Sequence, residues 1–241
     1  MTASTIPHPP IVSRDQWLAE RKKLLAPEKE LTKQLDRVNA ERRRLPMVKI
    51  EKDYAFDGPN GKQALNALFD GRRQLIVYHF MFGPSVRDGK EGCESCSFLV
   101  DHVDGANVHL AHHDVTFVAI SRTPLLQIES FKNRMGWHFK WVSSYGSDFN
   151  YDFHVSATKD ELAKGKMYYN YEMVEFQCEE QPGISVFYKD KTGDIFHTYS
   201  SYGRGGDILI GTYNYLDLTP FGRQEEKGQG MDWVRHHDRY D

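Results

Sequence analysis

Hydrophobic residues near the start of the chain recur with a helical period. Apolar side chains stand seven residues apart at Trp17, Leu24, Leu31, Val38 and Leu45. Such a stripe is typical of an amphipathic helix. Ser13 to Gln16 has the form of a capping box, and Pro27 interrupts the pattern, so we expect two helices or one kinked helix. The pattern predicts a helical extension over residues 1–46, which either packs on its own domain or forms an arm for a homodimer or another partner.

After residue 46 the pattern changes to short strands. Met47–Ile50 and Tyr54–Phe56 have the composition of strands, and Asp57–Gly61 has that of a turn, so we expect a hairpin here. Leu75–Phe82 is a continuous apolar run. Such a run is typical of a strand that is buried on both faces of a sheet.

The elements that follow predict a mixed sheet. Helical spacing begins at about Cys93, Val115–Ile120 is a second apolar strand, and Leu125–Met135 is a second helix. This order predicts parallel pairing of the two strands with right-handed crossovers. Further along, Ile184–Tyr188 and Ile195–Tyr199 flank a turn sequence and predict a β-hairpin. The intervening segment 137–153 is rich in aromatic residues, a composition that suits the lining of a binding groove.

The strongest candidate for chemistry is the pair Cys93 and Cys96, which stands at the expected start of a helix. Two cysteines with this spacing can close a disulfide, and the positive field of a helix N-terminus favours the reactive thiolate at the first of them. The same spacing can bind a soft metal or be inert. A structural zinc site normally needs a second pair of ligands, and Cys178 is the only other cysteine. We therefore favour redox or thiol chemistry.

Composition excludes several classes of partner. The chain has 241 residues with 31 basic and 34 acidic side chains, a net charge of −3, so its overall charge calls for neither nucleic acid nor an anionic membrane. No apolar stretch approaches the roughly 18 residues that span a bilayer. The segment Met1–Pro10 has no signal-like core. We expect one soluble, cytoplasmic domain with extensions, in which a disulfide would be transient.

Several longer segments together resemble a bacterial thioredoxin-like family that is catalogued as a domain of unknown function. They are Leu75–Pro84, Gly92–Phe98 with its GCxSCS motif, Arg134–Trp137, Trp141–Ser144, Ser147–Phe153, His197–Ser200 and Leu216–Arg223. The resemblance covers nearly the whole chain. It implies an α/β fold, a thioredoxin-like central mixed sheet flanked by helices, over residues 47–223, with the helical extension before it and a polar tail at 224–241.

By similarity to thioredoxins, Cys93 would attack a disulfide and Cys96 would resolve the mixed disulfide. Pro182 would be a cis-proline that faces the pair and lets the neighbouring backbone bind an extended peptide; the alternative is an ordinary proline at the start of a strand. Two features depart from thioredoxins: the residues between the cysteines are Glu94 and Ser95, and no Trp precedes Cys93. The proline and threonine that peroxiredoxins place before their reactive cysteine are also absent, since Val86 and Lys90 stand there. A conventional peroxidase is therefore disfavoured.

Other residues are candidates for binding. His79, on the strand before the cysteines, is either a hydrogen-bonded core residue, a proton shuttle to Cys96 or a third metal ligand. Arg204 is either an ordinary loop arginine or a residue that binds an anionic substrate such as a small thiol. Trp141 could shield the pair from water or form a substrate groove, or it is a plain core aromatic residue.

These observations favour a thiol-disulfide oxidoreductase that acts on proteins or on low-molecular-weight thiols and disulfides and needs no bound cofactor. Two alternatives remain open. One is a module that binds copper(I) or another soft metal through Cys93 and Cys96, with His79 as a further ligand. The other is a non-redox scaffold that binds a partner through its aromatic segment and its N-terminal helices.

Overall fold

A computed structural model describes residues 9–83, 85–176, 178–225 and 230–240. The chain divides into two compact units, residues 1–46 with 215–224 and residues 47–214 with 225–241. Residues 1–8, which form most of the segment that lacks a signal-like core, lie outside the described residues, as do 226–229 and 241 in the polar tail.

The first unit contains one long helix, α1 (Arg14–Arg42). The predicted capping box is present: the Ser13 hydroxyl accepts the Gln16 N–H, and the Gln16 side chain accepts the Ser13 N–H. The helix continues through Pro27, so of the two expected alternatives the division into two helices is wrong, and one helix forms. An ion pair of 2.7 Å between Arg21 and Glu28 spans the turn that Pro27 weakens. No residue of α1 is buried, and Leu31 in the apolar stripe is 71% exposed.

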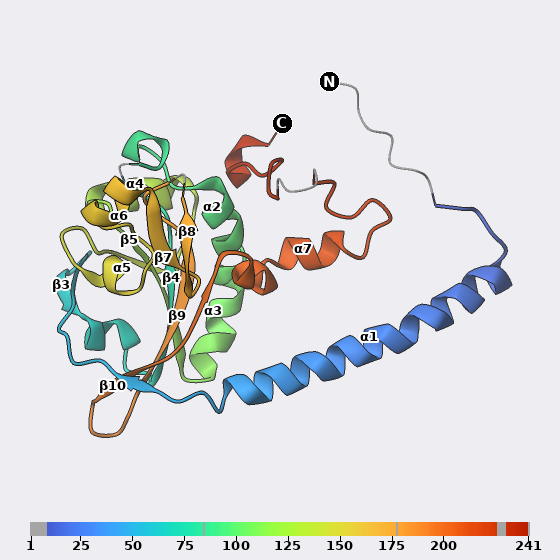
Figure 1. The fold of residues 1–241 in the computed structure, drawn as a ribbon, viewed down its shortest axis with the longest axis horizontal. Helices are drawn as coiled ribbons and strands as arrows, with labels where there is room; N and C mark the ends of the chain where they lie inside the picture. The colour runs from blue at the N-terminus through green and yellow to red at the C-terminus, as the bar shows by residue number, and fades with distance from the viewer. Residues whose placement is uncertain (1–8, 84, 177, 226–229, 241) are drawn as a thin grey trace. The chain divides into compact units, whose positions relative to one another are not determined.

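The second unit is built on an eight-stranded mixed sheet with the order β1-β10-β9-β4-β5-β6-β2-β3 (Figure 1). At its centre β4 (Gln74–His79), β5 (Val115–Ser121) and β6 (Lys140–Ser143) are parallel, whereas β9 (Gly183–Lys189) runs antiparallel to β4. The remaining strands of this sheet are β1 (Val48–Lys49), β2 (Ala55–Gly58), β3 (Gly61–Ala64) and β10 (Ile195–Tyr202).

Helices connect or follow these strands. They are α2 (Glu94–Val100), α3 (Val103–His112), α4 (Leu125–Arg134), α5 (Phe149–Asp152), α6 (Lys159–Lys164) and α7 (Gly211–Leu216), with short 3₁₀ helices η1 (Leu65–Phe69), η2 (Arg87–Gly89), η3 (Gly203–Leu209) and η4 (His237–Arg239). The last two residues of α7 belong to the first unit. A small separate sheet pairs β7 (Lys166–Tyr169) with β8 (Glu172–Glu175). In Figure 1, α2 and α3 run beside one face of the large sheet, and α5 lies beside the other.

This topology is thioredoxin-like. The unit β4-α2-α3-β5 supplies two adjacent parallel strands, and the antiparallel hairpin β9–β10 adds to the free edge of β4. The predicted parallel pairing of the two apolar strands and the predicted hairpin after Pro182 are therefore confirmed. The first hairpin forms across the turn between β2 and β3, whereas the strand at Val48–Lys49 pairs with β10 instead.

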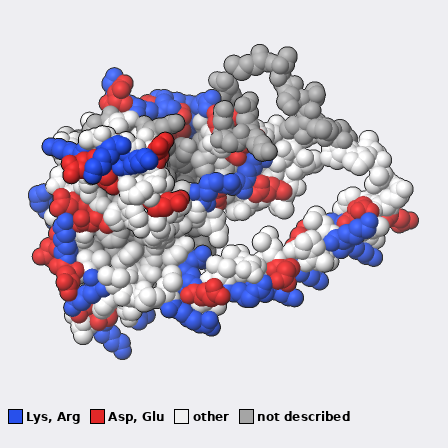
Figure 2. Space-filling model, viewed as in Figure 1, with Lys and Arg blue, Asp and Glu red and all other residues white. Residues whose placement is uncertain are grey.

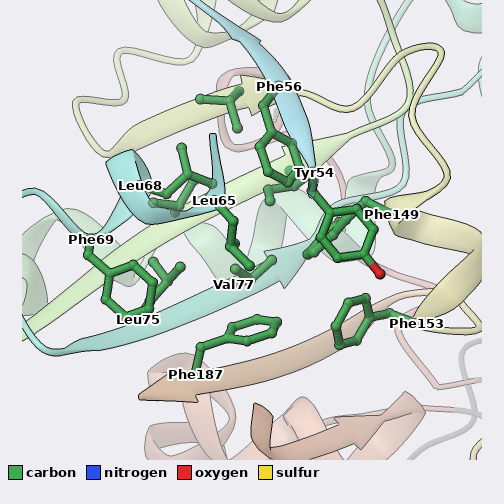
Figure 3. Packing of buried hydrophobic residues seen from close by; sticks show 13 residues of the cluster. Tyr54, Phe56, Leu65, Leu68, Phe69, Leu75, Val77, Phe149, Phe153 and Phe187 are labelled. Atoms are coloured by element: carbon green, nitrogen blue, oxygen red, sulfur yellow. The ribbon is translucent and has the colours of Figure 1, made fainter. Parts of the chain in front are cut away.

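The hydrophobic core on one face of the sheet fixes the orientation of β4. Leu75 and Val77 point into a cluster with Phe149, Phe153 and Phe187, and Figure 3 shows these side chains meeting residues of η1 and β2. Because side chains alternate along a strand, Tyr78 and Phe80 point to the opposite face. That opposite face carries α2 and therefore the cysteines.

The aromatic segment is mostly core. Trp137, Phe139, Trp141, Phe149 and Phe153 are all buried, whereas Tyr145 is 60% exposed. The expectation of an aromatic binding groove in this segment is therefore wrong, because these rings are packed in the interior on the two faces of the sheet.

The surface has no dominant sign of charge on the face that Figure 2 shows, where acidic and basic side chains are intermixed. Within the described ranges, none of the helices combines the length and the hydrophobicity that crossing a bilayer requires.

Candidate active site

Cys93 occupies the N-cap position of α2, as the sequence predicts. Its φ of −61° and ψ of 133° are extended, and its carbonyl accepts the Ser97 N–H at 2.9 Å and the Ser97 hydroxyl at 2.8 Å. Its own N–H donates to the Met81 carbonyl at 3.1 Å. The start of α2 is thus tied directly to the end of β4, and this contact places the cysteine pair at the carboxyl edge of the parallel strands.

The local environment activates Cys93. Its side chain is partly exposed, and a hydrogen bond with the Cys96 thiol lowers the pKa of Cys93 to about 7 against the opposing effect of burial. The backbone N–H groups of Cys96 and Ser95 also lower this pKa. A sulfur in the first turn of a helix is held as thiolate by these donors.

Cys96 has the opposite character. It is 1% exposed, and burial raises the pKa of its thiol well above the usual value. The thiolate of Cys93 beside it raises this pKa further. Cys93, Cys96 and Cys178 are all free thiols in this structure. The pair therefore combines one accessible, acidic thiol with one buried, weakly acidic thiol.

Two tyrosines lie near Cys96 that sequence reasoning did not single out. The Tyr78 hydroxyl, on β4, donates a hydrogen bond to Cys96 that lowers the pKa of the cysteine, and Tyr78 itself is 3% exposed. Tyr169, on β7, is close enough that the charge of Cys96 raises the tyrosine's pKa. Alternation along β4 puts Tyr78 and His79 on opposite faces, so the sequence did contain a signal that only one of them could face the cysteines.

The charge of Glu94 is compensated. The sequence suggests that this carboxylate opposes a thiolate at Cys93, but Glu94 forms an ion pair with Arg87 of η2. The loop before the cysteines thus supplies a cation that offsets the adjacent negative charge.

Pro182 is not a cis-proline. No cis peptide bond occurs in the described part of the chain. The segment before β9 is extended because it pairs with residues 155–157: the Ala157 N–H donates to the Glu179 carbonyl and the Gln181 N–H donates to the Val155 carbonyl, each at 2.9 Å. The Pro182 carbonyl accepts the Tyr169 hydroxyl at 2.6 Å. Pro182 therefore contacts Tyr169, and the backbone beside it is already paired.

His79 lies on the other face of the sheet. Its ring stacks on Phe149 and Phe153, and its Nε2 is 2.9 Å from the Ser185 hydroxyl. Burial lowers the pKa of His79 to about 3. The structure therefore does not bring His79 to the cysteines, either as a proton shuttle or as a metal ligand. No group of three His, Cys, Asp or Glu side chains among the described residues is arranged to hold a metal ion.

Trp141 and Arg204 differ in their exposure. Trp141 is 2% exposed, packs on Phe80 at a ring distance of 4.5 Å and donates from Nε1 to the Ser121 hydroxyl. It is a core residue on the cysteine-bearing face. Arg204 is on η3, where its side chain is 88% exposed and bonds Asp207 at 3.1 Å.

A buried carboxylate, Glu180, was not predicted. It is 2% exposed, its Oε2 accepts the Phe82 N–H at 3.0 Å, and its Oε1 has no hydrogen-bond partner within the described residues. The nearest cation, Arg122, is 3.9 Å away and bonds Glu179 at 2.9 Å. Burial raises the pKa of Glu180 to about 7. No sequence pattern marks it, because it follows another glutamate in a polar loop.

Comparisons with known proteins give a family and a set of distant folds. The model of a family described as bacterial protein of unknown function (DUF899) matches residues 6–240. No curated protein matches the chain. Among solved structures, a mutant of PrxQ from Xylella fastidiosa is similar, with 10% identity, a TM-score of 0.45, and coverage of 71% of this chain and 97% of its own.

Two further structures are similar at the same level. Peroxidoxin BcpB from Mycobacterium tuberculosis has 11% identity and a TM-score of 0.41, with coverage of 71% and 97%. A thiol:disulfide interchange protein, DsbE, from Chlorobium tepidum has 11% identity and a TM-score of 0.41, with coverage of 68% and 93%.

Proposed function

The chain belongs to the DUF899 family of bacterial proteins, and from the geometry of its cysteine pair we propose that it is a thiol-disulfide oxidoreductase. The observation that carries the proposal is the inequality of the two thiols. Cys93 is partly exposed with a pKa of about 7, whereas Cys96 is buried with a raised pKa. A nucleophile for disulfides works best when its pKa is near the ambient pH, and its resolving partner must be shielded until the mixed disulfide forms.

The reaction proceeds in two exchanges. The Cys93 thiolate attacks one sulfur of a substrate disulfide, a bond between Cys93 and that sulfur forms, and the other substrate sulfur leaves as a thiolate. Cys96 then loses its proton to the departed thiolate and attacks Cys93. The bond between the two cysteines forms, and the second substrate sulfur leaves and takes up a proton. Two electrons pass from the cysteine pair to the substrate, and an external thiol must reduce the pair again.

Tyr78 supports the second exchange. Its hydroxyl donates a hydrogen bond to Cys96, and this donation stabilises the buried thiolate that must form before resolution. Its own burial raises the pKa of Tyr78 well above the usual value, so it stays protonated and keeps its donor. Both electrons come from the two thiols, so the proposed reaction needs no bound cofactor.

The proposed substrates are disulfides of low-molecular-weight thiols or of proteins. The partly exposed position of Cys93 gives a substrate sulfur access to the nucleophile. Oxidised glutathione is a suitable first probe because it carries one disulfide and no fold of its own.

The test is to trap the intermediate. In a Cys178→Ser background, Cys96→Ser protein treated with oxidised glutathione should accumulate one glutathione per chain on Cys93, measured by intact mass. Cys93→Ser protein should remain unmodified, and protein with both cysteines should pass to an internal disulfide. The background substitution ensures that any adduct is on the pair.

The soft-metal alternative predicts a different result. Purified protein would contain a stoichiometric ion that either cysteine substitution releases, and neither variant would hold a glutathione adduct. An absence of any disulfide between Cys93 and Cys96 under mild oxidants, together with bound metal, would reject the oxidoreductase.

A further inference from the structure

The C-terminal segment, residues 230–240, packs against the loop that leads into Cys93. Its central residue, His236, is fully buried with 0% exposure. His236 Nε2 lies 2.9 Å from the carbonyl oxygen of Gly92, which immediately precedes Cys93. The two residues are 144 positions apart in the sequence, so this contact is a specific long-range one.

The contact fixes one peptide group from both ends. The carbonyl of Gly92 and the N–H of Cys93 belong to the same planar peptide. His236 donates to its oxygen, and the Met81 carbonyl accepts from its N–H at 3.1 Å. A peptide held at both ends cannot rotate, and the Ser97 N–H holds the Cys93 carbonyl on the other side of the Cα. The backbone of Cys93 is therefore held at the start of α2, beside the N–H groups of Ser95 and Cys96, which lower the pKa of its thiol.

The orientation of the His236 ring is itself determined. Its Nδ1 lies 2.8 Å from Arg134 Nη2, which can only donate, so Nδ1 accepts and Nε2 carries the hydrogen. The ring also packs on Phe131 at a centroid distance of 5.2 Å. Arg134 is held in turn by ion pairs of 2.7 Å to Glu91 and 3.0 Å to Asp238.

The loop has little freedom to move away. A Cβ at Gly92 would lie 2.5 Å from the Phe80 ring and 2.8 Å from the Phe131 ring, so the backbone here is in close contact with both aromatic residues. Arg239 adds a second link from the C-terminal segment, since its Nη1 donates to Glu91 at 2.9 Å. The ion pairs of Arg134 and Arg239 with Glu91 thus accompany the buried hydrogen bond between His236 and Gly92.

We propose that His236 is a positioning residue for Cys93: through the Gly92 carbonyl it holds the nucleophile in the conformation that stabilises its thiolate. The role rests on the proposed function, because the step it serves is the attack of Cys93 on a disulfide. Its test, however, measures the thiolate itself and needs no substrate disulfide.

The experiment compares three variants in a Cys178→Ser background by the pH dependence of iodoacetamide alkylation at Cys93. His236→Leu removes the donor and should raise the alkylation midpoint by about 0.5 to 1 pH unit, the equivalent of one ordinary hydrogen bond. His236→Gln can donate to Gly92 and accept from Arg134, so it should restore the midpoint. His237→Leu is the matched control, because His237 bonds Asp101 at 2.6 Å and not the Gly92 peptide.

An unchanged midpoint in folded His236→Leu protein would overturn the proposal, as would an equal shift in His237→Leu. If His236→Leu does not fold, a variant with Arg239→Met and Asp238→Asn loosens the segment without touching the histidine. It should shift the midpoint in the same direction, and no shift would overturn the proposal. Failure of glutathione trapping with a normal midpoint shift would reject the oxidoreductase alone.

Discussion

Replacing Cys96 with Ala should make Cys93 a much weaker acid. The hydrogen bond from Cys96 is the largest cause of the lowered pKa of Cys93, which is about 7 against 9.0 for an ordinary thiol on the same scale. A hydrogen bond to a charged group contributes about 1.5 to 3 kcal/mol, which corresponds to about 1 to 2 pKa units. The backbone N–H groups of residues 95 and 96 remain, so the alkylation midpoint should rise to between about 8 and 9.

The same numbers predict how reactive the native thiol is. At pH 7 a thiol with a pKa of about 7 is half ionised, whereas one with a pKa of 9.0 is about 1% ionised. A thiolate with the lower pKa is also the weaker nucleophile, by about 6- to 10-fold for this difference in pKa. Cys93 should therefore react about 5 to 8 times faster than an ordinary thiol at pH 7, because the gain in ionisation exceeds the loss in nucleophilicity.

The assay is alkylation with iodoacetamide from pH 5 to pH 10, followed by intact mass, in a Cys178→Ser background so that the product is unambiguous. Cys96→Ser is the matched control, since its hydroxyl can still donate to Cys93 and should give an intermediate midpoint. A midpoint near 7 in Cys96→Ala protein would refute the reasoning, because the thiolate would then depend on other groups.

Three further predictions concern other parts of the chain. Tyr78→Phe removes a hydrogen bond to Cys96, so closure of the disulfide between Cys93 and Cys96 should slow about 5-fold. The mixed disulfide should then accumulate in quenched-flow mass spectra. An unchanged rate of closure would exclude the role of Tyr78 in the second exchange. Burial raises the pKa of Glu180 from 4.5 to about 7, so its contribution to stability is complete below pH 4.5 and is lost as the pH rises through 7. Glu180→Gln should therefore be more stable than the parent in urea unfolding at pH 8, by up to about 3 kcal/mol, and this advantage should vanish near pH 4; a pH-independent difference would contradict the assignment. Removal of residues 1–45 takes away the exposed apolar stripe of α1 and should lower the oligomeric mass in light scattering, whereas an unchanged mass and melting temperature would show that the stripe pairs with nothing.

The elements that sequence patterns predict well are those with continuous signals. The apolar runs of β4 and β5 predict both strands and their parallel pairing, and the turn between β9 and β10 predicts that hairpin. Cys93 at the start of a helix follows from the Gly-rich loop before it. These features depend on local periodicity and turn chemistry, which a sequence displays directly.

The rest of the site depends on contacts between distant segments. A strand that is apolar on both faces does not reveal which face receives α2, so the sequence cannot choose between Tyr78 and His79. Pro182 is trans, and the segment before it pairs with residues 155–157, a short pairing that no pattern marks. His236 meets Gly92 only after the C-terminal segment has packed. Periodicity carries no information about such partners.

The pairing of residues 179–181 with 155–157 has a consequence for selectivity. A peptide that approaches beside Pro182 finds the Gln181 N–H, the Glu179 carbonyl and the Pro182 carbonyl already bonded, so none of these three groups can pair with its backbone. Discrimination then depends on steric bulk around the substrate sulfur atoms, and not on the length or direction of the substrate chain. Backbone N-methylation of a peptide disulfide should accordingly leave its rate of reduction unchanged, and short and long substrates with the same residues beside their cysteines should react alike.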